Sequence, residues 1–225
     1  MTSTERVHIY IDGGNFHHLV VKKLNIRELD FSFEDFANFL ANGRSITKYG
    51  KRFYVGTVRE ELGNKKSVEA MSKQTALFTG LLSSGWQIKT SKLRKRVEKI
   101  IIDSRVVGYQ ELLKKGVQQI EFERMREKGI DVKLATDVIV GAVDDQYDTA
   151  IVVSSDGDLV PAIDWVRHRT HKKVEYIGFS IIDESPLRMD TRPLNAMISR
   201  SDIQRILVKS DLQPFIKPSV QTPLL

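Results

Sequence analysis

An almost unbroken apolar run at residues 147–154 constrains the fold of this chain more than any other feature. Runs that do not alternate between polar and apolar residues are typical of strands in parallel sheets, which are buried on both faces. Shorter runs of strand type at residues 7–11, 52–58, 86–90 and 174–179 alternate with segments of helical periodicity. This alternation predicts a three-layer α/β fold, with a mainly parallel central sheet flanked by helices.

Apolar residues at helical spacing place the covering helices between these strands. The predicted helices are 15–24 with Asn15 as its N-cap, 33–40, 69–82, 132–143 with Asp131 as its N-cap, and 159–169. Residues 201–207 predict one more short apolar element, and residues 91–129 predict a basic insertion with a charged helix at 118–128. We expect one domain over residues 1–209 and an extended tail over residues 210–225, where three prolines fall.

The composition narrows the classes of partner and of site. The chain has 225 residues and a formal charge of +6, which favours a polyanionic partner such as nucleic acid. It has no cysteine, which excludes disulfides and thiolate metal sites and is compatible with a reducing compartment. No window approaches the roughly 18 uninterrupted apolar residues of a membrane span. We therefore expect a soluble cytoplasmic protein with no membrane partner.

Aspartates follow two of the predicted strands. Asp12 closes the first strand, and Asp156 and Asp158 come directly after the apolar run. In an open parallel sheet, functional groups gather at the carboxyl ends of the strands, so these side chains should meet if the two strands are neighbours. Each aspartate alone has an ordinary alternative as a turn or cap residue, and Asp158 is placed to cap the helix that begins at Leu159.

Asp137 is the aspartate for which the sequence offers no simple structural role. It lies inside an otherwise apolar helix, where a carboxylate is costly unless a cation or a polar group receives it. Asp131 precedes it by six residues and so lies about 120° away around the helix, which leaves Asp131 the role of the cap. Carboxylates that converge without cysteine or paired histidine offer oxygen ligands only, and these suit Mg²⁺ or Mn²⁺ rather than Zn²⁺.

Four motifs follow one another along the chain: YIDGGNF, GIDVKLATD, YDTAIVVSSDGDLVPAIDWVR and KKVEYIGF. In order and spacing they resemble the NYN family of PIN-like ribonucleases, and most closely its LabA-like branch. The resemblance implies a PIN-like Rossmannoid fold, and RNA hydrolysis by water with Mg²⁺ or Mn²⁺ held by acidic residues. It assigns the catalytic and metal-binding roles to the aspartates at the motif positions, which are Asp12, Asp137, Asp156 and Asp158.

Further positions are candidates for contact with the substrate. Asn15 matches a polar residue of the family that could orient Asp12 or a water molecule, and its alternative is an ordinary N-cap. Ser154 and Ser155 are small enough to allow close approach of a phosphate, although small residues equally suit a tight strand end. Lys133 departs from the family pattern and faces either phosphate or solvent.

The start of the insertion is strongly basic. Between residues 89 and 99 there are six basic residues and one acidic residue. Charge of this density can follow a phosphate backbone with little preference for sequence, and we expect RNA contacts from Lys92, Arg94, Lys95 and Arg96. A solvated arm or a partner-binding surface is the alternative for an isolated basic run.

The sequence thus favours a metal-dependent endoribonuclease with RNA as its substrate. The main rival is a PIN-like module without catalytic activity that binds RNA or a regulatory protein. A phosphatase or a nucleotide-binding Rossmann protein is less favoured, because YIDGGN lacks the second aspartate of a DxD motif and its glycines do not form GxGxxG. The identity of the RNA, the number of metal ions and the formation of a homo-oligomer are left open by the sequence.

Overall fold

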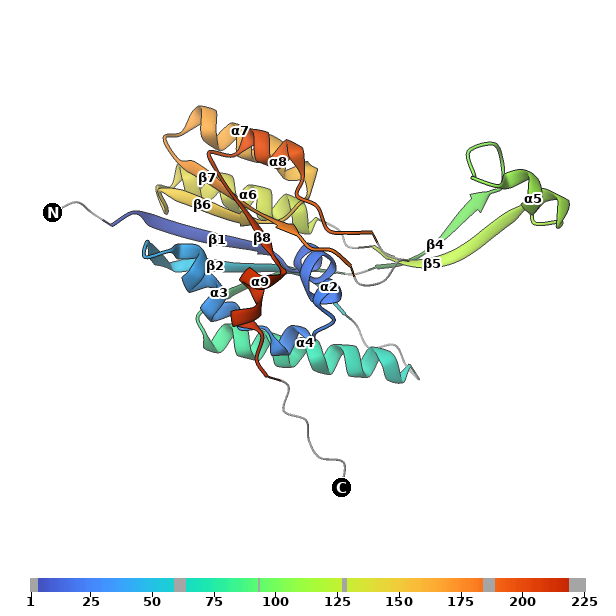
Figure 1. The fold of residues 1–225 in the computed structure, drawn as a ribbon, viewed down its shortest axis with the longest axis horizontal. Coiled ribbons are helices and arrows are strands. Elements are labelled where there is room, and N and C mark those ends of the chain that lie inside the picture. Colours follow the sequence, from blue (N-terminus) through green and yellow to red (C-terminus); the bar gives the residue numbers. More distant parts are fainter. Residues whose placement is uncertain (1–3, 59–63, 93, 127–128, 184–188, 219–225) are drawn as a thin grey trace, which may run out of the picture.

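The computed structural model describes residues 4–58, 64–92, 94–126, 129–183 and 189–218 (Figure 1). At its centre is a six-stranded sheet with the strand order β3-β2-β1-β6-β7-β8. Its strands are β1 (Arg6–Asp12), β2 (Ser45–Thr57), β3 (Gln87–Lys92), β6 (Thr149–Val153), β7 (Lys173–Ser180) and β8 (Ile203–Val208). All neighbouring strands run parallel, which confirms the predicted α/β fold with a parallel sheet.

Helices cover both faces of the sheet (Figure 1). One face carries α1 (Gly13–Phe16), α2 (Lys22–Leu24), α3 (Phe33–Ala41), α4 (Lys65–Ser83) and α9 (Lys209–Leu212). The other face carries α6 (Ile130–Val143), α7 (Val160–Arg169) and α8 (Asn195–Arg200). A π-helical stretch, His17–Val21, joins α1 to α2. Within the described ranges, no helix has the length and apolar character that crossing a membrane requires.

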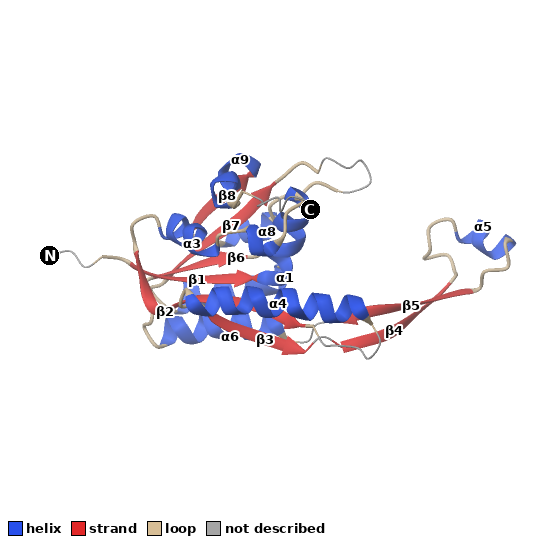
Figure 2. Cartoon of the chain, turned by 90° about the horizontal axis from the view of Figure 1, so that it is seen from below, coloured by secondary structure: helices blue, strands red, loops and turns tan. Residues whose placement is uncertain are grey.

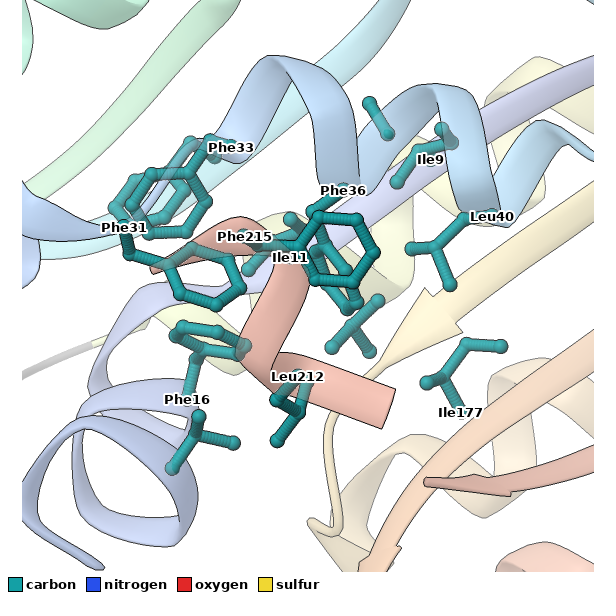
Figure 3. Close-up of a cluster of buried hydrophobic side chains, with 14 of the residues drawn as sticks. Ile9, Ile11, Phe16, Phe31, Phe33, Phe36, Leu40, Ile177, Leu212 and Phe215 are labelled. Carbon is teal, nitrogen blue, oxygen red and sulfur yellow. The ribbon is translucent and has the colours of Figure 1, made fainter. Parts of the chain in front are cut away.

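The sequence of β1 explains how both faces of the sheet are buried. Ile9 and Ile11 belong to the hydrophobic cluster under α3 and α4, whereas Tyr10, between them, belongs to the cluster under α6 and α7. Successive side chains of a strand point to opposite faces, so a strand that is covered on both sides needs apolar residues at every position. Figure 3 shows the first cluster, to which Phe31 and Phe36 also contribute.

The predicted insertion is an arm that projects from the body of the protein (Figures 1 and 2). It consists of β4 (Arg94–Ile101) and β5 (Gln119–Arg126), paired antiparallel, with α5 (Tyr109–Lys114) at its far end. The prediction of a charged helix at 118–128 is therefore wrong. Ile120 and Phe122 alternate with Glu121 and Glu123, and this period of two is the signal of a strand rather than a helix.

The end of the chain is more ordered than the sequence suggested. The short apolar element predicted at 201–207 is a sixth strand of the sheet, β8, which pairs in parallel with β7. The segment that was expected to be a tail forms α9 and then a 3-10 turn, Gln213–Phe215. Leu212 and Phe215 are buried in the cluster under α3, so the predicted start of a tail at residue 210 is corrected. Residues 219–225 lie outside the described part of the chain.

Candidate active site at the switch point of the sheet

The order of the strands reverses between β1 and β6, because β2 and β3 extend the sheet on one side and β7 and β8 on the other. Ligand sites of open parallel sheets lie at such a point, outside the carboxyl ends of the strands. Ile11 lies opposite Val153. The next residues, Asp12 and Ser154, therefore meet, and the Ser154 hydroxyl donates to Asp12 Oδ2 at 3.1 Å. The expectation that these two strands are neighbours is confirmed.

Asp12 is fixed at the end of β1 by the turn that follows it. Its Oδ1 accepts a hydrogen bond from the backbone N–H of Asn15 at 2.9 Å, and the residue is only 6% exposed. Asp12 is thus the N-cap of α1, and the predicted cap at Asn15 is wrong. The turn passes so close to β2 that a Cβ on Gly13 would lie 2.5 Å from the Phe53 ring, which explains the glycine there.

Asn15, Ser154 and Ser155 join this turn to the loop after β6. Asn15 Oδ1 accepts a hydrogen bond from the Ser155 N–H at 2.9 Å, and Ser154 Oγ accepts one from the Asp156 N–H at 3.2 Å. The Ser155 hydroxyl is paired with the Tyr176 hydroxyl at 2.8 Å. Ser154 is buried and Ser155 is half-buried. These contacts hold the Asp156 backbone in place beside the end of β1.

Asp156 and Asp158 share the short turn that leads into α7. Asp156 Oδ1 accepts from the Asp158 N–H at 2.9 Å, and Asp156 thereby caps a 3-10 turn, Gly157–Leu159. The N-cap of α7 is Leu159, which forms no side-chain cap hydrogen bond. Capping of that helix by Asp158 is therefore contradicted, and its exposed side chain is left at the edge of the sheet.

Asp131 is the acidic residue of this region that the sequence reasoning missed. The N-cap of α6 is Gly129, with φ at +79°, so the cap assigned to Asp131 is wrong. Burial raises the pKa of Asp131 above its ordinary value, and the charges of Asp156 and Asp158 raise it further. α6 also contacts the 3-10 turn Gly157–Leu159, which bears Asp158. Asp131 thus lies in the first turn of α6 on the same side of the molecule as the loop after β6.

The carboxylate of Asp137 contacts residues of β2 and β3 rather than the other aspartates. Its Oδ2 accepts a hydrogen bond from the Tyr54 hydroxyl at 2.7 Å and lies 3.6 Å from Arg52 Nη1 and 3.7 Å from Lys89 Nζ. Six residues separate it from Asp131, which is about 9 Å along the helix axis. Burial raises the pKa of Tyr54, and the hydrogen bond to Asp137 raises it further, so Tyr54 stays a donor. The polar partners that a carboxylate in this helix requires are therefore residues of β2 and β3.

The carboxylates do not form a ready-made metal cage. In the described part of the chain, no three His, Asp or Glu side chains stand close enough together to hold a metal ion. The type of donor does fit a hard divalent cation, because carboxylate oxygens are the available ligands at this edge of the sheet. Repulsion from Asp156 and Asp158, added to burial, keeps the pKa of Asp131 raised, and a cation would relieve that repulsion.

The basic residues that were predicted to contact RNA differ in their contacts and exposure. Lys133 Nζ donates to the Thr90 carbonyl at 2.5 Å and so links α6 to β3. Lys92 and Arg96 are exposed where the arm begins. The side chains of Arg94 and Lys95 lie outside the described part of the structure.

Pairing within the arm adds basic residues that the sequence did not single out. Arg96 lies opposite Arg124, and Arg94 lies opposite Arg126. Like charges directly opposite each other on paired strands are destabilising without a counter-ion, and Glu98 Oε2, 3.8 Å from Arg124 Nη1, supplies one for Arg124. The signal for these positions was available only once β5 was known to be a strand.

Replacement of Asp131 by asparagine is expected to raise the thermal stability of the metal-free protein at neutral pH. The pKa of Asp131 is raised above 3.8 by folding, so the folded chain binds this proton more tightly than the unfolded chain does. The resulting stability is present below pH 3.8 and is lost as the pH rises through the raised pKa. Melting temperatures of both proteins should therefore converge in acid and separate at neutral pH. Equal melting temperatures at neutral pH would contradict the placement of Asp131 beside Asp156 and Asp158.

The chain was compared with models of known protein families, with curated proteins and with solved structures. The model of the NYN domain matches residues 6–191, a range that contains every aspartate discussed above. A solved structure of a protein of unknown function from Vibrio parahaemolyticus is similar, with a TM-score of 0.55 at 16% sequence identity over 92% of this chain and 95% of that chain. At this identity the similarity supports the fold alone. A comparison with curated proteins gave no match.

Proposed function

Because this chain belongs to the NYN domain family, we propose that it is a PIN-like endoribonuclease that hydrolyses RNA with the help of Mg²⁺ or Mn²⁺. The observation that carries the proposal is the contact between Ser154 and Asp12, which joins the ends of β1 and β6 at the switch point of the sheet. The loop that bears Asp156 and Asp158 follows β6 directly. Carboxylates therefore gather where parallel sheets bind their ligands.

We assign the metal ion to Asp12, Asp131, Asp156 and Asp158. In this set Asp131 takes the place that the sequence gave to Asp137, whose carboxylate binds Tyr54 and lies near Arg52 and Lys89 instead. When bound, the ion would activate a water molecule and stabilise the leaving oxygen of the phosphodiester.

The polar neighbours of the carboxylates act as positioning residues in this proposal. Asn15 donates to Asp12 through its backbone and accepts from the Ser155 N–H through its side chain. The Ser154 hydroxyl donates to Asp12 and accepts from the Asp156 N–H. These bonds limit the rotation of the carboxylates and of their loop before substrate binds, which lowers the cost of reaching a reactive arrangement. No side chain is required as a covalent nucleophile.

The substrate is held, in this proposal, by the base of the arm. Lys92 ends β3 at the same edge of the sheet as Asp12, because these strands run parallel to one another. Residues 92–96 and 124–126 contain six basic residues and no acidic residue. Basic residues at this density attract a phosphate backbone with little preference for sequence. We therefore propose that the RNA backbone crosses the base of the arm on its way to the carboxylates.

On the ordered motifs we also assign the chain to the LabA-like branch, and we propose the cytoplasm as its location. The rival function is an RNA-binding module without catalysis, which would use the same basic surface. The two functions differ in one respect that can be measured, namely whether RNA is cut in a metal-dependent way.

Cleavage of labelled RNA by the purified protein is expected to stop in a chelator and to return when Mn²⁺ or Mg²⁺ is added in excess. The physical reason is that four carboxylates alone repel the phosphodiester, whereas a bound cation attracts it. A matched preparation of Asp156→Asn should bind the RNA yet show no cleavage at any metal concentration. Cleavage that persists in the chelator would refute metal dependence, and RNA binding without cleavage under all conditions would establish the rival.

A further inference from the structure

The arm changes its chemical character along its length. All the charged residues of its base are basic, as described above, but residues 97–101 of β4 and 119–123 of β5 contain one basic residue and three acidic residues. We call these ten positions the distal ribbon. A strand of the length of β4 spans about 26 Å, so the distal ribbon extends away from the edge of the sheet (Figure 2). Its net negative charge disfavours a nucleic acid there.

The distal ribbon has no further strand or packed layer to support it in the part of the chain that the structure describes. A two-stranded ribbon is marginally stable in water unless a further strand or a packed layer supports it. The extensive contacts of β4 and β5 are with each other, and the arm stands away from the helices of the body (Figures 1 and 2). On the ribbon, Val97 is 66% exposed and Ile101 is 60% exposed. These exposed apolar side chains on an unsupported ribbon are available to pack against another protein.

One face of the distal ribbon is self-complementary in charge, because one strand carries a basic residue and the other carries acidic residues. Val97, Lys99 and Ile101 alternate along β4 and so point to the same face. Glu121 of β5 lies opposite Lys99 on that face. Lys99 Nζ is 3.8 Å from Glu121 Oε1, and the two side chains are 50% and 54% exposed. The face therefore has a basic and apolar column on one strand and an acidic column on the other.

From this pattern we propose that the distal ribbon binds a second copy of the chain. A two-fold axis that runs along the arm would stack two ribbons face to face and set β4 of one over β5 of the other. Lys99 would then face the partner's Glu121, while Val97 and Ile101 would lie over the partner's Glu123 and Gln119, whose aliphatic stems would cover them. Such an interface is isologous, so each contact occurs twice. The proposal goes beyond the proposed function, since it concerns assembly and neither the carboxylates nor cleavage.

Sedimentation of the full chain over a range of concentrations tests the dimer. Wild type is expected to form a dimer that dissociates on dilution. Lys99→Glu places a glutamate over the partner's Glu121 at both copies of the contact, and Glu121→Lys places lysine over lysine. Each substitution alone should weaken the dimer on the order of tenfold in dissociation constant, because two weak attractions become repulsions.

The decisive sample is an equimolar mixture of the two variants. A Lys99→Glu chain paired with a Glu121→Lys chain regains an attractive contact at both positions, so the mixture should form a heterodimer that neither variant forms alone. An effect of the substitutions within one arm would not produce this recovery. Lys73→Glu, which disrupts the exposed pair with Glu69 on α4, is the matched control and should leave the dimer unchanged.

Three results would overturn the proposal. One is a monomeric wild type at every concentration, which would leave the distal ribbon to a different protein. Another is a dimer that both charge-reversed variants form as well as wild type does, because the interface would then lie elsewhere. The last is a mixture of the variants that shows no recovery of the dimer.

Discussion

Asp131→Asn is expected to lower metal-dependent RNA cleavage on the order of a hundredfold to a thousandfold, the usual cost of losing one preorganised electrostatic group. The reason is its position. α6 contacts the 3-10 turn that bears Asp158, and the charges of Asp156 and Asp158 add to the burial that raises the pKa of Asp131. We therefore propose Asp131 as the carboxylate of α6 that a cation at this edge would contact. Single-turnover cleavage with saturating metal separates the loss in rate from any loss in RNA binding.

Asp137→Asn provides the contrast on the same helix. Its carboxylate accepts from the Tyr54 hydroxyl and lies near Arg52 and Lys89, and an asparagine oxygen can still accept from Tyr54. We expect this variant to keep most of its cleavage rate, and to lose stability because two cations are no longer compensated. Unlike Asp131→Asn, it should not gain stability at neutral pH. If Asp137→Asn abolishes cleavage and Asp131→Asn does not, the sequence assignment was right and the reassignment is wrong.

Much of the site could be predicted because strand patterns determine where strands end. The apolar run at residues 147–154 and the shorter run at 7–11 predicted two buried parallel strands, and both carry aspartates at their carboxyl ends. Their adjacency follows from the strand order of doubly wound sheets. The hydrogen bond from Ser154 to Asp12 is the direct consequence. Strand period and topology were therefore sufficient to predict that the ends of β1 and β6 meet.

The choice between Asp131 and Asp137 required the direction of α6. A helix that leads into a parallel strand runs back across the sheet, so its first turn lies at the edge where the strands end. That rule favours Asp131, in the first turn, over Asp137, about 9 Å further along. Asp137 stood out in the sequence instead because it is a carboxylate among apolar neighbours. This criterion did not anticipate Tyr54, a partner from β2 that is distant in sequence.

The arm was misjudged for a related reason. A charged segment with many helix-forming residues was assigned to a helix, although Ile120 and Phe122 alternate with acidic residues. Only pairing with β4 makes that alternation meaningful, because each strand of a ribbon needs the other for its hydrogen bonds. The cross-strand positions of Arg96 and Arg124 could not be inferred until the register was known.

Phe16→Ala is expected to lower the free energy of unfolding by about 3–5 kcal/mol, the range found when a buried phenylalanine is truncated. Phe16 is 1% exposed and belongs to the cluster of buried side chains in Figure 3. Its ring centroid lies 5.1 Å from that of Phe31, 5.4 Å from that of Phe33, and 5.8 Å from those of Phe36 and Phe179. Urea unfolding followed by circular dichroism measures the change.

Phe39→Ala is the matched control, since Phe39 belongs to the same aromatic group but is 41% exposed. Its truncation should cost much less, because a partly exposed ring leaves little cavity behind. Equal losses in the two variants would show that the burial of the ring does not determine the loss of stability.

The comparison also bears on the candidate site, because Phe16 belongs to α1, a helix of one turn whose N-cap is Asp12. We expect a cavity at Phe16 to loosen that turn before the rest of the fold. Phe16→Ala should therefore lose cleavage activity at denaturant concentrations where the sheet is still folded. Phe39→Ala should lose activity and structure together.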